Sequence, residues 1–344
     1  MRALLTSFGL RILSALCVLC AAIAIPTDAR SYVRTRTKAS CLPLRWAQTC
    51  IFLQPDAELA RDDMAADAVT AAIQGAIQSW NDRLDPSSFL RLYYLAPSES
   101  REVSQTDRLG SIKFRFDRWC RPAKDANSSP ICFDPAATAV TTVTFLNKPT
   151  EPDLDGQIVD TDIDLNAVGF RFVDGTQTLP SGEKRPVVDL WNVLTHELGH
   201  VQGLDHTCNL DFGSQPACMT DDKGDPVPSC TELDTMRRTS QSAETAFEAA
   251  MYPTSVAGDY SRRTPTSDDL AGVIVSHPAS SDPQSCKIPT VVSGCHAVSQ
   301  GETLRGSTHV WALLGMLCLP ILFLARQRRK TSRHPKPFCF RDTL

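Results

Sequence analysis

The sequence predicts an α+β domain, because segments patterned as strands and segments patterned as helices occur along the same chain. Three segments carry strand patterns, and others place apolar residues at helical spacing or begin with helix-capping residues. The chain has 344 residues, of which 42% are hydrophobic and 22% charged. That is enough for one domain of about 200–250 residues with further segments attached.

The first predicted element is a long helix at Ala66–Trp80, which is rich in alanine and carries apolar residues at helical spacing. A strand is predicted at Ser111–Asp117, where apolar and polar residues alternate, and another at Ala139–Leu146, which is rich in β-branched residues. A third strand is predicted at Gln157–Asn166, where aspartates alternate with apolar residues.

Three more helices are predicted in the second half of the chain. One follows Pro186, and a short one covers Ala243–Ala250. A third lies within Thr264–Ile274, where capping residues precede acidic residues in the first turn. The helix after Pro186 buries one apolar face, formed by Val188, Leu190, Trp191, Leu194, Leu198 and Val201.

That helix carries the most informative stretch of the sequence, Thr195–Thr207, which contains the pattern H-E-x-x-H-x-x-G-x-x-H. The spacing of four residues places His196 and His200 one turn apart on the same helix face, so both imidazoles reach one metal ion. A glycine three residues after His200, Gly203, ends the helix at little cost in a left-handed conformation. The chain then turns back and presents His206 as a third nitrogen ligand.

Three protein ligands with one open position are typical of a catalytic zinc ion, whereas a structural zinc is closed by four protein ligands. Glu197 lies beside the two helical histidines, where its carboxylate takes a proton from a metal-activated water. The pattern therefore predicts one catalytic Zn²⁺ bound by His196, His200 and His206, with Glu197 as the general base. The alternatives are a chance match and a degenerate site.

These residues resemble the metzincin clan of zinc metalloproteases, and most closely the matrixin family. Metzincins carry a methionine in a tight turn beneath the metal, and Met251 in Ala249–Pro253 matches this turn. Thr207 also suits matrixins, which have a small hydroxyl residue after the third histidine. The sequence departs from the family in one distance, because Met251 lies 45 residues after His206. The alternative for Met251 is an ordinary core methionine.

The resemblance implies a twisted, mostly parallel sheet with an antiparallel edge strand, packed on long helices that include the zinc-binding helix. Its first strand would include Cys41–Trp46. Gln157–Asn166 resembles the metzincin edge strand, in which Thr161, Asp162, Ile163 and Asp164 would pair with a bound substrate. The alternative is an ordinary edge strand protected by its acids.

The resemblance also implies support around the site. The pair Asp268–Asp269 would hold the amino terminus and the methionine turn. A structural Ca²⁺ would bind the acidic loop Glu151–Gly156, and Asp221–Asp225 has a similar composition. The alternative for both loops is a solvated acidic turn.

The activity implied is that of a zinc endopeptidase acting on extracellular proteins or peptides. The alternative from another class is a non-catalytic, surface-anchored module that keeps the zinc and binds peptides or partners. The intact Glu197 favours the enzyme, because zinc binding does not need that carboxylate.

The two ends of the chain carry the patterns of targeting segments. Residues 1–29 predict a secretory signal peptide, with Arg2 and Arg11 flanking the start of an apolar run and cleavage near Ala29. An uncleaved anchor is the alternative. The protease domain then covers 30–278, with a disulfide-tied insertion at 207–248 near the cleft, and 279–308 forms a polar stalk.

Residues 309–330 predict a transmembrane helix or a sorting signal, because the apolar run Val310–Ala325 is followed by a basic cluster. With Gly294-Cys295 before it, this segment resembles carboxyl-terminal sorting signals of some Gram-negative bacteria, in which a sorting protease removes the tail. Residues 331–344 form a further tail. The sequence thus predicts a secreted protein at the cell surface or anchored in a membrane.

Charge and cysteine content agree with secretion. The net charge is −4; residues 1–29 carry +1 and residues 326–344 carry +6, which leaves −11 for residues 30–325. Such an acidic body argues against nucleic acid as a partner. Outside the two terminal segments lie nine of the 13 cysteines, which predicts an oxidising compartment. Cys41–Cys50 and Cys120–Cys132 are natural local pairs, and Cys208–Cys218 and Cys230–Cys286 complete one of the 105 connectivities open to eight cysteines.

Overall fold

The computed structural model describes residues 31–287 apart from 60–63, 99–101, 104–106, 124, 126, 176–181 and 211–217. The chain separates into two units, Met1–Pro289 and Thr290–Leu344, and all described residues belong to the first. The predicted signal peptide, the apolar run near the carboxyl terminus and the last tail lie outside the described residues.

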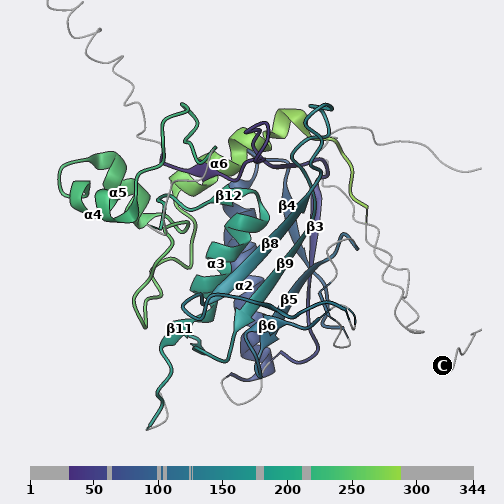
Figure 1. Ribbon diagram of the computed structural model, residues 1–344, viewed down its shortest axis with the longest axis vertical. Coiled ribbons are helices and arrows are strands. Elements are labelled where there is room, and N and C mark those ends of the chain that lie inside the picture. Colours follow the sequence, from purple (N-terminus) through teal and green to yellow (C-terminus); the bar gives the residue numbers. More distant parts are fainter. Residues whose placement is uncertain are drawn as a thin grey trace, which may run out of the picture. The chain divides into compact units, whose positions relative to one another are not determined.

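A six-stranded, mostly parallel sheet forms the centre of the domain (Figure 1). Its longest strand is β9, which has β8 on one side and both β2 and β5 on the other, followed by β3 and β4. Only the pair β8–β9 is antiparallel. The strands are β2 (Arg45–Trp46), β3 (Cys50–Pro55), β4 (Arg91–Tyr94), β5 (Gly110–Arg115), β8 (Ala139–Phe145) and β9 (Gln157–Asn166). The mixed class and the mostly parallel sheet agree with the prediction.

The predicted edge strand, however, lies in the interior of the sheet. Ile163 of β9 is paired with Ile112 of β5 on one side and with Thr141 of β8 on the other. The assignment of Gln157–Asn166 as an edge strand is therefore wrong. Ile163 and Asp164 are paired on both sides, and Thr161 and Asp162 are paired with β8, so the predicted pairing of Thr161, Asp162, Ile163 and Asp164 with a substrate along an open edge is wrong with it. The antiparallel edge strand is β8.

The alternation in β9 arises from two different buried surroundings. Ile163 and Leu165 are fully buried in the hydrophobic core on the helix side. The side chains of Asp160, Asp162 and Asp164 point to the other face, yet they are at most 1% exposed. An ionic face and a solvated face produce the same sequence pattern, which explains the wrong assignment.

Two helices, α2 (Ala66–Leu84) and α3 (Leu190–Val201), pack against one face of the sheet and share its core (Figure 1). Helix α2 confirms the prediction and continues four residues beyond Trp80. The Trp80 indole N–H donates to the Thr195 carbonyl of α3 at 2.9 Å. Gly75 allows close contact between the helices, since a Cβ there would lie 2.5 Å from the Trp191 ring.

The other elements surround this core. Helix α6 (Ser267–Ser276) begins at the Thr266 capping box, and α5 (Gln241–Glu248) matches the predicted short helix within two residues at each end, whereas α4 (Cys230–Met236) was not predicted. The remaining elements are β1 (Val33–Arg34) paired with β12 (Leu204–Asp205), β6 (Cys120–Arg121) paired with β7 (Ile131–Cys132), β10 (Arg171–Val173) paired with β11 (Val187–Asp189), and a 3₁₀ turn at Ala279–Ser281.

Four disulfides cross-link the domain, and only Cys120–Cys132 was predicted correctly. The other three predicted pairs are wrong. The observed pairs are Cys41–Cys218, Cys50–Cys286 and Cys208–Cys230. Four disulfides are typical of secreted or extracellular proteins.

The tertiary fold explains the wrong pairs. Cys50 opens β3 next to the end of the described domain, where the Thr49 N–H donates to the Ser285 carbonyl at 2.8 Å. Cys208 and Cys230 are brought together by the segments beside them, where the Asn209 N–H donates to the Pro228 carbonyl at 2.9 Å. The local pairs Cys41–Cys50 and Cys208–Cys218 were favoured by sequence proximity, whereas the fold joins each of these cysteines to a more distant partner.

No helix within the described residues is long and apolar enough to cross a membrane. The run Val310–Ala325 lies outside the described residues, so membrane anchoring stays a prediction.

Candidate metal centre

The H-E-x-x-H-x-x-G-x-x-H pattern lies on α3 and on the turn that follows it. Asp189 caps the start of the helix, and its carboxylate accepts a hydrogen bond from the Asn192 N–H at 2.8 Å. The helix ends at Val201 with Gln202 as its C-cap, and Gly203 follows with a φ of +92°, the left-handed conformation that the sequence predicts for this position. The chain then reverses into β12, which pairs with β1 and leads directly to His206.

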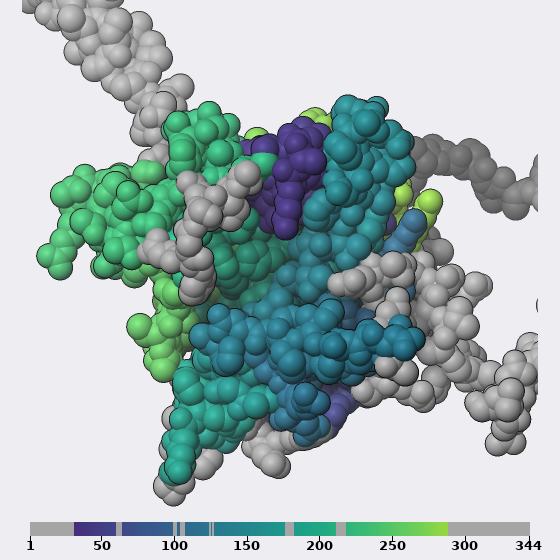
Figure 2. Space-filling model, in the orientation of Figure 1, coloured from purple at the N-terminus to yellow at the C-terminus, as the bar shows by residue number. Residues whose placement is uncertain are grey.

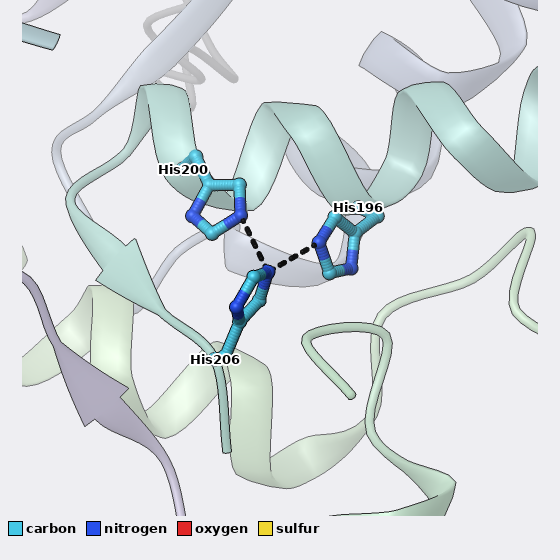
Figure 3. A group of neighbouring side chains, drawn as sticks. All are labelled: His196, His200 and His206. Atoms are coloured by element: carbon cyan, nitrogen blue, oxygen red, sulfur yellow. Dashed lines mark hydrogen bonds between the residues drawn. The ribbon is translucent and has the colours of Figure 1, made fainter. Parts of the chain in front are cut away.

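The three predicted histidines converge on one point (Figure 3). The Nε2 atom of His206 lies 3.2 Å from Nε2 of His196 and 3.2 Å from Nε2 of His200. One ligand atom from each ring lies within 4.8 Å of the others, and no other such group of histidines, cysteines or carboxylates occurs in the described part of the chain.

Backbone carbonyls fix the orientation of two of the rings. His196 Nδ1 lies 2.7 Å from the Ala250 carbonyl oxygen, and His200 Nδ1 lies 2.9 Å from the Leu204 carbonyl oxygen. A carbonyl only accepts, so in both rings Nδ1 carries the proton. The Nε2 lone pairs of His196 and His200 are then directed at the shared point, as metal coordination requires.

Burial keeps the His196 and His206 rings neutral. It lowers the pKa of His196 to about 3, with a further contribution from the neighbouring His200. Burial also lowers the pKa of His206 well below its ordinary value, and the other two histidines act in the same direction. A neutral imidazole is the form that binds a metal ion.

The separations fit a tetrahedral metal ion. Two nitrogen ligands at about 2.0–2.1 Å from a tetrahedral zinc ion are roughly 3.3–3.4 Å apart. The two Nε2–Nε2 distances of 3.2 Å are close to this value. The residues present therefore fit one ion with three nitrogen ligands and an open fourth position.

Glu197 lies beside this point and is only 6% exposed. Its Oε2 atom accepts a hydrogen bond from the Thr141 hydroxyl of β8 at 2.6 Å. Burial raises the pKa of Glu197, while His200 and the Thr141 hydrogen bond act against this rise. A carboxylate with a raised pKa next to a metal position is suited to accept a proton and give it up again.

Met251 packs directly beneath the helix that carries the ligands. A Cβ on Gly199, between His196 and His200, would lie 2.1 Å from the Met251 sulfur, so only glycine allows this contact. The Asp269 carboxylate accepts hydrogen bonds from the N–H groups of Ala250 and Met251, at 2.9 and 3.2 Å, and also caps α6. Asp269 thus supports the same turn whose Ala250 carbonyl orients His196.

Further hydrogen bonds connect the segment after His206 and the amino-terminal segment to the site. The Thr207 N–H donates to the Met251 carbonyl at 3.2 Å, and its hydroxyl donates to the Ala246 carbonyl at 2.9 Å. The Ser31 N–H donates to Asp268 at 2.7 Å. Asp268 and Asp269 therefore make the contacts that the sequence predicts for them, one to the amino-terminal segment and one to the methionine turn.

The predicted insertion forms the helices α4 and α5 and stands out on one side of the domain (Figure 2). It has a small core of its own, in which Cys208, Leu233, Ala246 and Tyr252 meet. The surface is hollowed between this insertion and the strands that include β8.

In the two loops proposed for calcium, oxygen atoms have protein partners. The Arg45 guanidinium binds the carbonyls of Asp153 and Asp155 at 2.8 and 3.1 Å, and Asp155 accepts the Lys148 N–H at 2.7 Å. In the second loop, Asp221 accepts two N–H groups of its own turn, and Asp222 pairs with Arg34 at 2.7 Å. Calcium binding stays a prediction.

Sequence reasoning missed Thr141 as a residue of the site. A signal was present, because Thr141 lies between Ala139 and Val143, which pack against the core, and alternation puts all three on one face of β8. A hydroxyl in such a row needs a polar partner.

No family model and no curated protein matches the chain. Among solved structures, the chain is similar to a chain of the "GM1 bound form of the ECX AB5 holotoxin". The sequence identity is 10%, the TM-score is 0.31, and the match covers 73% of this chain and 90% of that chain. A similarity of this size supports no conclusion about fold or function.

Proposed function

We propose that the protein is a zinc-dependent endopeptidase that hydrolyses peptide bonds of extracellular proteins. His196, His200 and His206 would hold the zinc ion, and Glu197 would act as general base. The observation that carries the proposal is the convergence of three imidazole nitrogens beside a buried carboxylate. Three ligands suffice to hold the ion, so the fourth position and the carboxylate are available for chemistry.

A zinc ion in this position supplies a Lewis acid that polarises the scissile carbonyl and activates a water molecule. Glu197 would take the proton of that water and then deliver it to the leaving amine. Its burial suits both steps, since burial brings its proton affinity closer to neutral pH. The Ala250 and Leu204 carbonyls would hold the histidine rings in place throughout.

The resemblance to matrixin-like metzincins supports the proposal. It implies a methionine turn under the metal, and Met251 packs against Gly199 at that position. It also implies an aspartate that holds this turn, and Asp269 makes those hydrogen bonds. The metzincin fold is thus part of the proposal.

The same resemblance implies an antiparallel edge strand that pairs with the bound substrate, and β8 is suited to this role. It pairs only with β9 among the described strands, and its residues are all partly exposed. We propose that a substrate peptide adds to the outer side of β8 through main-chain hydrogen bonds. Its scissile bond would then lie near Glu197, which contacts Thr141 of that strand.

The experiment compares the purified zinc-loaded protein with Glu197→Ala on a broad peptide library. We expect one zinc ion per chain in both, and a loss of cleavage on the order of 10²–10⁴-fold in the variant. A chelator should abolish the wild-type activity and added zinc should restore it. A protein that binds zinc but cleaves no peptide would be a non-catalytic binding module. A protein without zinc affinity would contradict the assignment of the three histidines.

A further inference from the structure

Packing alone does not explain why a hydroxyl residue, Thr141, occupies its position in β8. Its neighbours in the inward row of β8, Ala139 and Val143, pack against the core. Valine has nearly the shape of threonine and would fill the same space without a polar atom. A hydroxyl that is partly buried beside apolar side chains is costly unless it makes a hydrogen bond. Its partner here is Glu197.

The hydrogen bond is short and joins two elements distant in sequence. The Thr141 hydroxyl lies 2.6 Å from Glu197 Oε2 and 3.4 Å from the Glu197 carbonyl oxygen. It therefore connects the edge strand β8 with the metal-binding helix α3. Hydrogen bonds to a charged carboxylate are stronger than those between neutral groups.

This contact restricts the Glu197 carboxylate. Of the two Glu197 carboxylate oxygens, only Oε2 has a hydrogen-bond partner among the described residues, so Oε1 is available to accept a hydrogen bond from a water molecule. A carboxylate held at one oxygen cannot rotate freely. Catalysis by a base depends on such fixed geometry, because a displaced base loses contact with the proton that it must accept.

We propose that Thr141 is the positioning residue of the proposed general base, holding the Glu197 carboxylate with one oxygen directed to the water and linking its orientation to the substrate-pairing strand. This inference rests on the proposed endopeptidase function. It assigns Thr141 a part in the reaction that is separate from the fold and from metal binding.

The experiment uses Thr141→Val, Thr141→Ser and a control, Thr70→Val, in the full zinc-loaded chain. The control also removes a hydroxyl, one that donates to the Ala66 carbonyl of α2 at 2.9 Å, far from the site in sequence. For Thr141→Val we expect kcat to fall on the order of tenfold, with KM within about twofold and one zinc ion per chain. Thr141→Ser should restore kcat to within about threefold, and the control should match the wild type.

A second readout does not depend on activity. In the metal-free protein, Thr141→Val should lower Tm by about 2–4 °C, because a buried carboxylate loses its donor. In a Glu197→Ala background the same substitution should leave Tm nearly unchanged, since the partner is absent. An equal loss of Tm in both backgrounds would show that the hydroxyl has a purely structural role.

The outcomes separate this inference from the proposed function. An inactive wild type would overturn both. An active wild type with unchanged kcat in Thr141→Val would overturn the inference alone. Loss of zinc from Thr141→Val, or a higher KM with unchanged kcat, would also overturn it, because the hydroxyl would then act in metal or substrate binding.

Discussion

The histidine centre and the aspartate row of β9 are both buried groups of titratable side chains, yet they are built in opposite ways. The histidines direct three Nε2 atoms at one another, two of them 3.2 Å from the third. The aspartates direct each carboxylate at a different protein partner. Asp164 binds Arg115 at 2.7 Å and Arg121 at 2.5 Å, and Asp162 accepts the Ser111 hydroxyl at 2.6 Å.

This difference separates a site from a structural network. Converging ligand atoms of like character repel or leave lone pairs unused unless a metal ion joins them. Divergent groups with their own donors need no ion. Both regions gather titratable side chains away from bulk water, so the direction of the polar atoms distinguishes a candidate metal site from a structural network.

The largest expected effect is on zinc affinity. His206→Ala leaves two nitrogen ligands, so we expect the affinity to fall on the order of 10³-fold, more than the roughly 10–100-fold cost of losing an outer hydrogen-bond partner of a ligand. Competition against a chromophoric chelator measures it. Asp164→Ala serves as the matched control and should bind zinc as the wild type does. Equal zinc loss in both variants would contradict the comparison.

A substitution in the aspartate row should instead lower the free energy of unfolding. Asp164 is fully buried and Arg115 is 6% exposed, so Asp164→Ala leaves a guanidinium buried without its main counter-charge. We expect a loss of about 3–5 kcal/mol in the free energy of unfolding. Urea unfolding with a tryptophan signal measures it. A loss below about 1 kcal/mol would show that the row is not an ionic network.

A smaller effect is expected at the floor of the histidine centre. In Gly199→Ala the new methyl would meet the Met251 sulfur, so the helix or the methionine must shift, at a cost of about 1–3 kcal/mol. Thermal unfolding of the metal-free protein measures it. The double variant Gly199→Ala/Met251→Ala should lose less free energy of unfolding than the sum of the losses in the two single variants. Strict additivity would mean that the two residues do not touch.

The smallest effect is a pH dependence of stability that arises in the aspartate row. Burial, together with the charges of Asp162 and Asp107, raises the pKa of Asp160 to about 7, and burial raises that of Asp162 to about 6. Because these values lie above the ordinary 3.8, the folded state binds more protons. Their contribution to stability is complete below pH 3.8 and is lost as the pH rises through 6 and 7.

Asp160→Asn removes one of these titrations. The difference in Tm between variant and wild type should therefore become more favourable to the variant as the pH rises from 4 to 8. A series of thermal unfolding curves at constant ionic strength measures this trend. A flat or reversed trend would contradict the raised pKa of Asp160.

Local patterns allowed the convergence of the three histidines to be predicted. The spacing of His196, Glu197 and His200 follows from helix geometry, and the turn to His206 follows from a left-handed Gly203. Met251 and Asp269 came from a resemblance, and both make the expected contacts. The helix at Ala66–Trp80 was also clear, because its apolar residues recur at one period over several turns.

What could not be predicted depends on partners distant in sequence. The edge strand was misplaced because acids buried against polar and basic groups of the protein give the same alternation as acids in water. Three disulfides were misassigned because Cys41 and Cys50 find partners 177 and 236 residues away. Thr141 was overlooked because a threonine in a β-branched strand is ordinary until its partner is known.

The most direct test of the metal centre is X-ray absorption at the zinc edge of the protein loaded with one equivalent of zinc. The arrangement of His196, His200 and His206 predicts three imidazole nitrogens and one oxygen at about 2.0–2.1 Å. A sulfur shell near 2.3 Å, which would come from cysteines, would contradict it. So would a shell of oxygens alone, which would place the ion among the carboxylates.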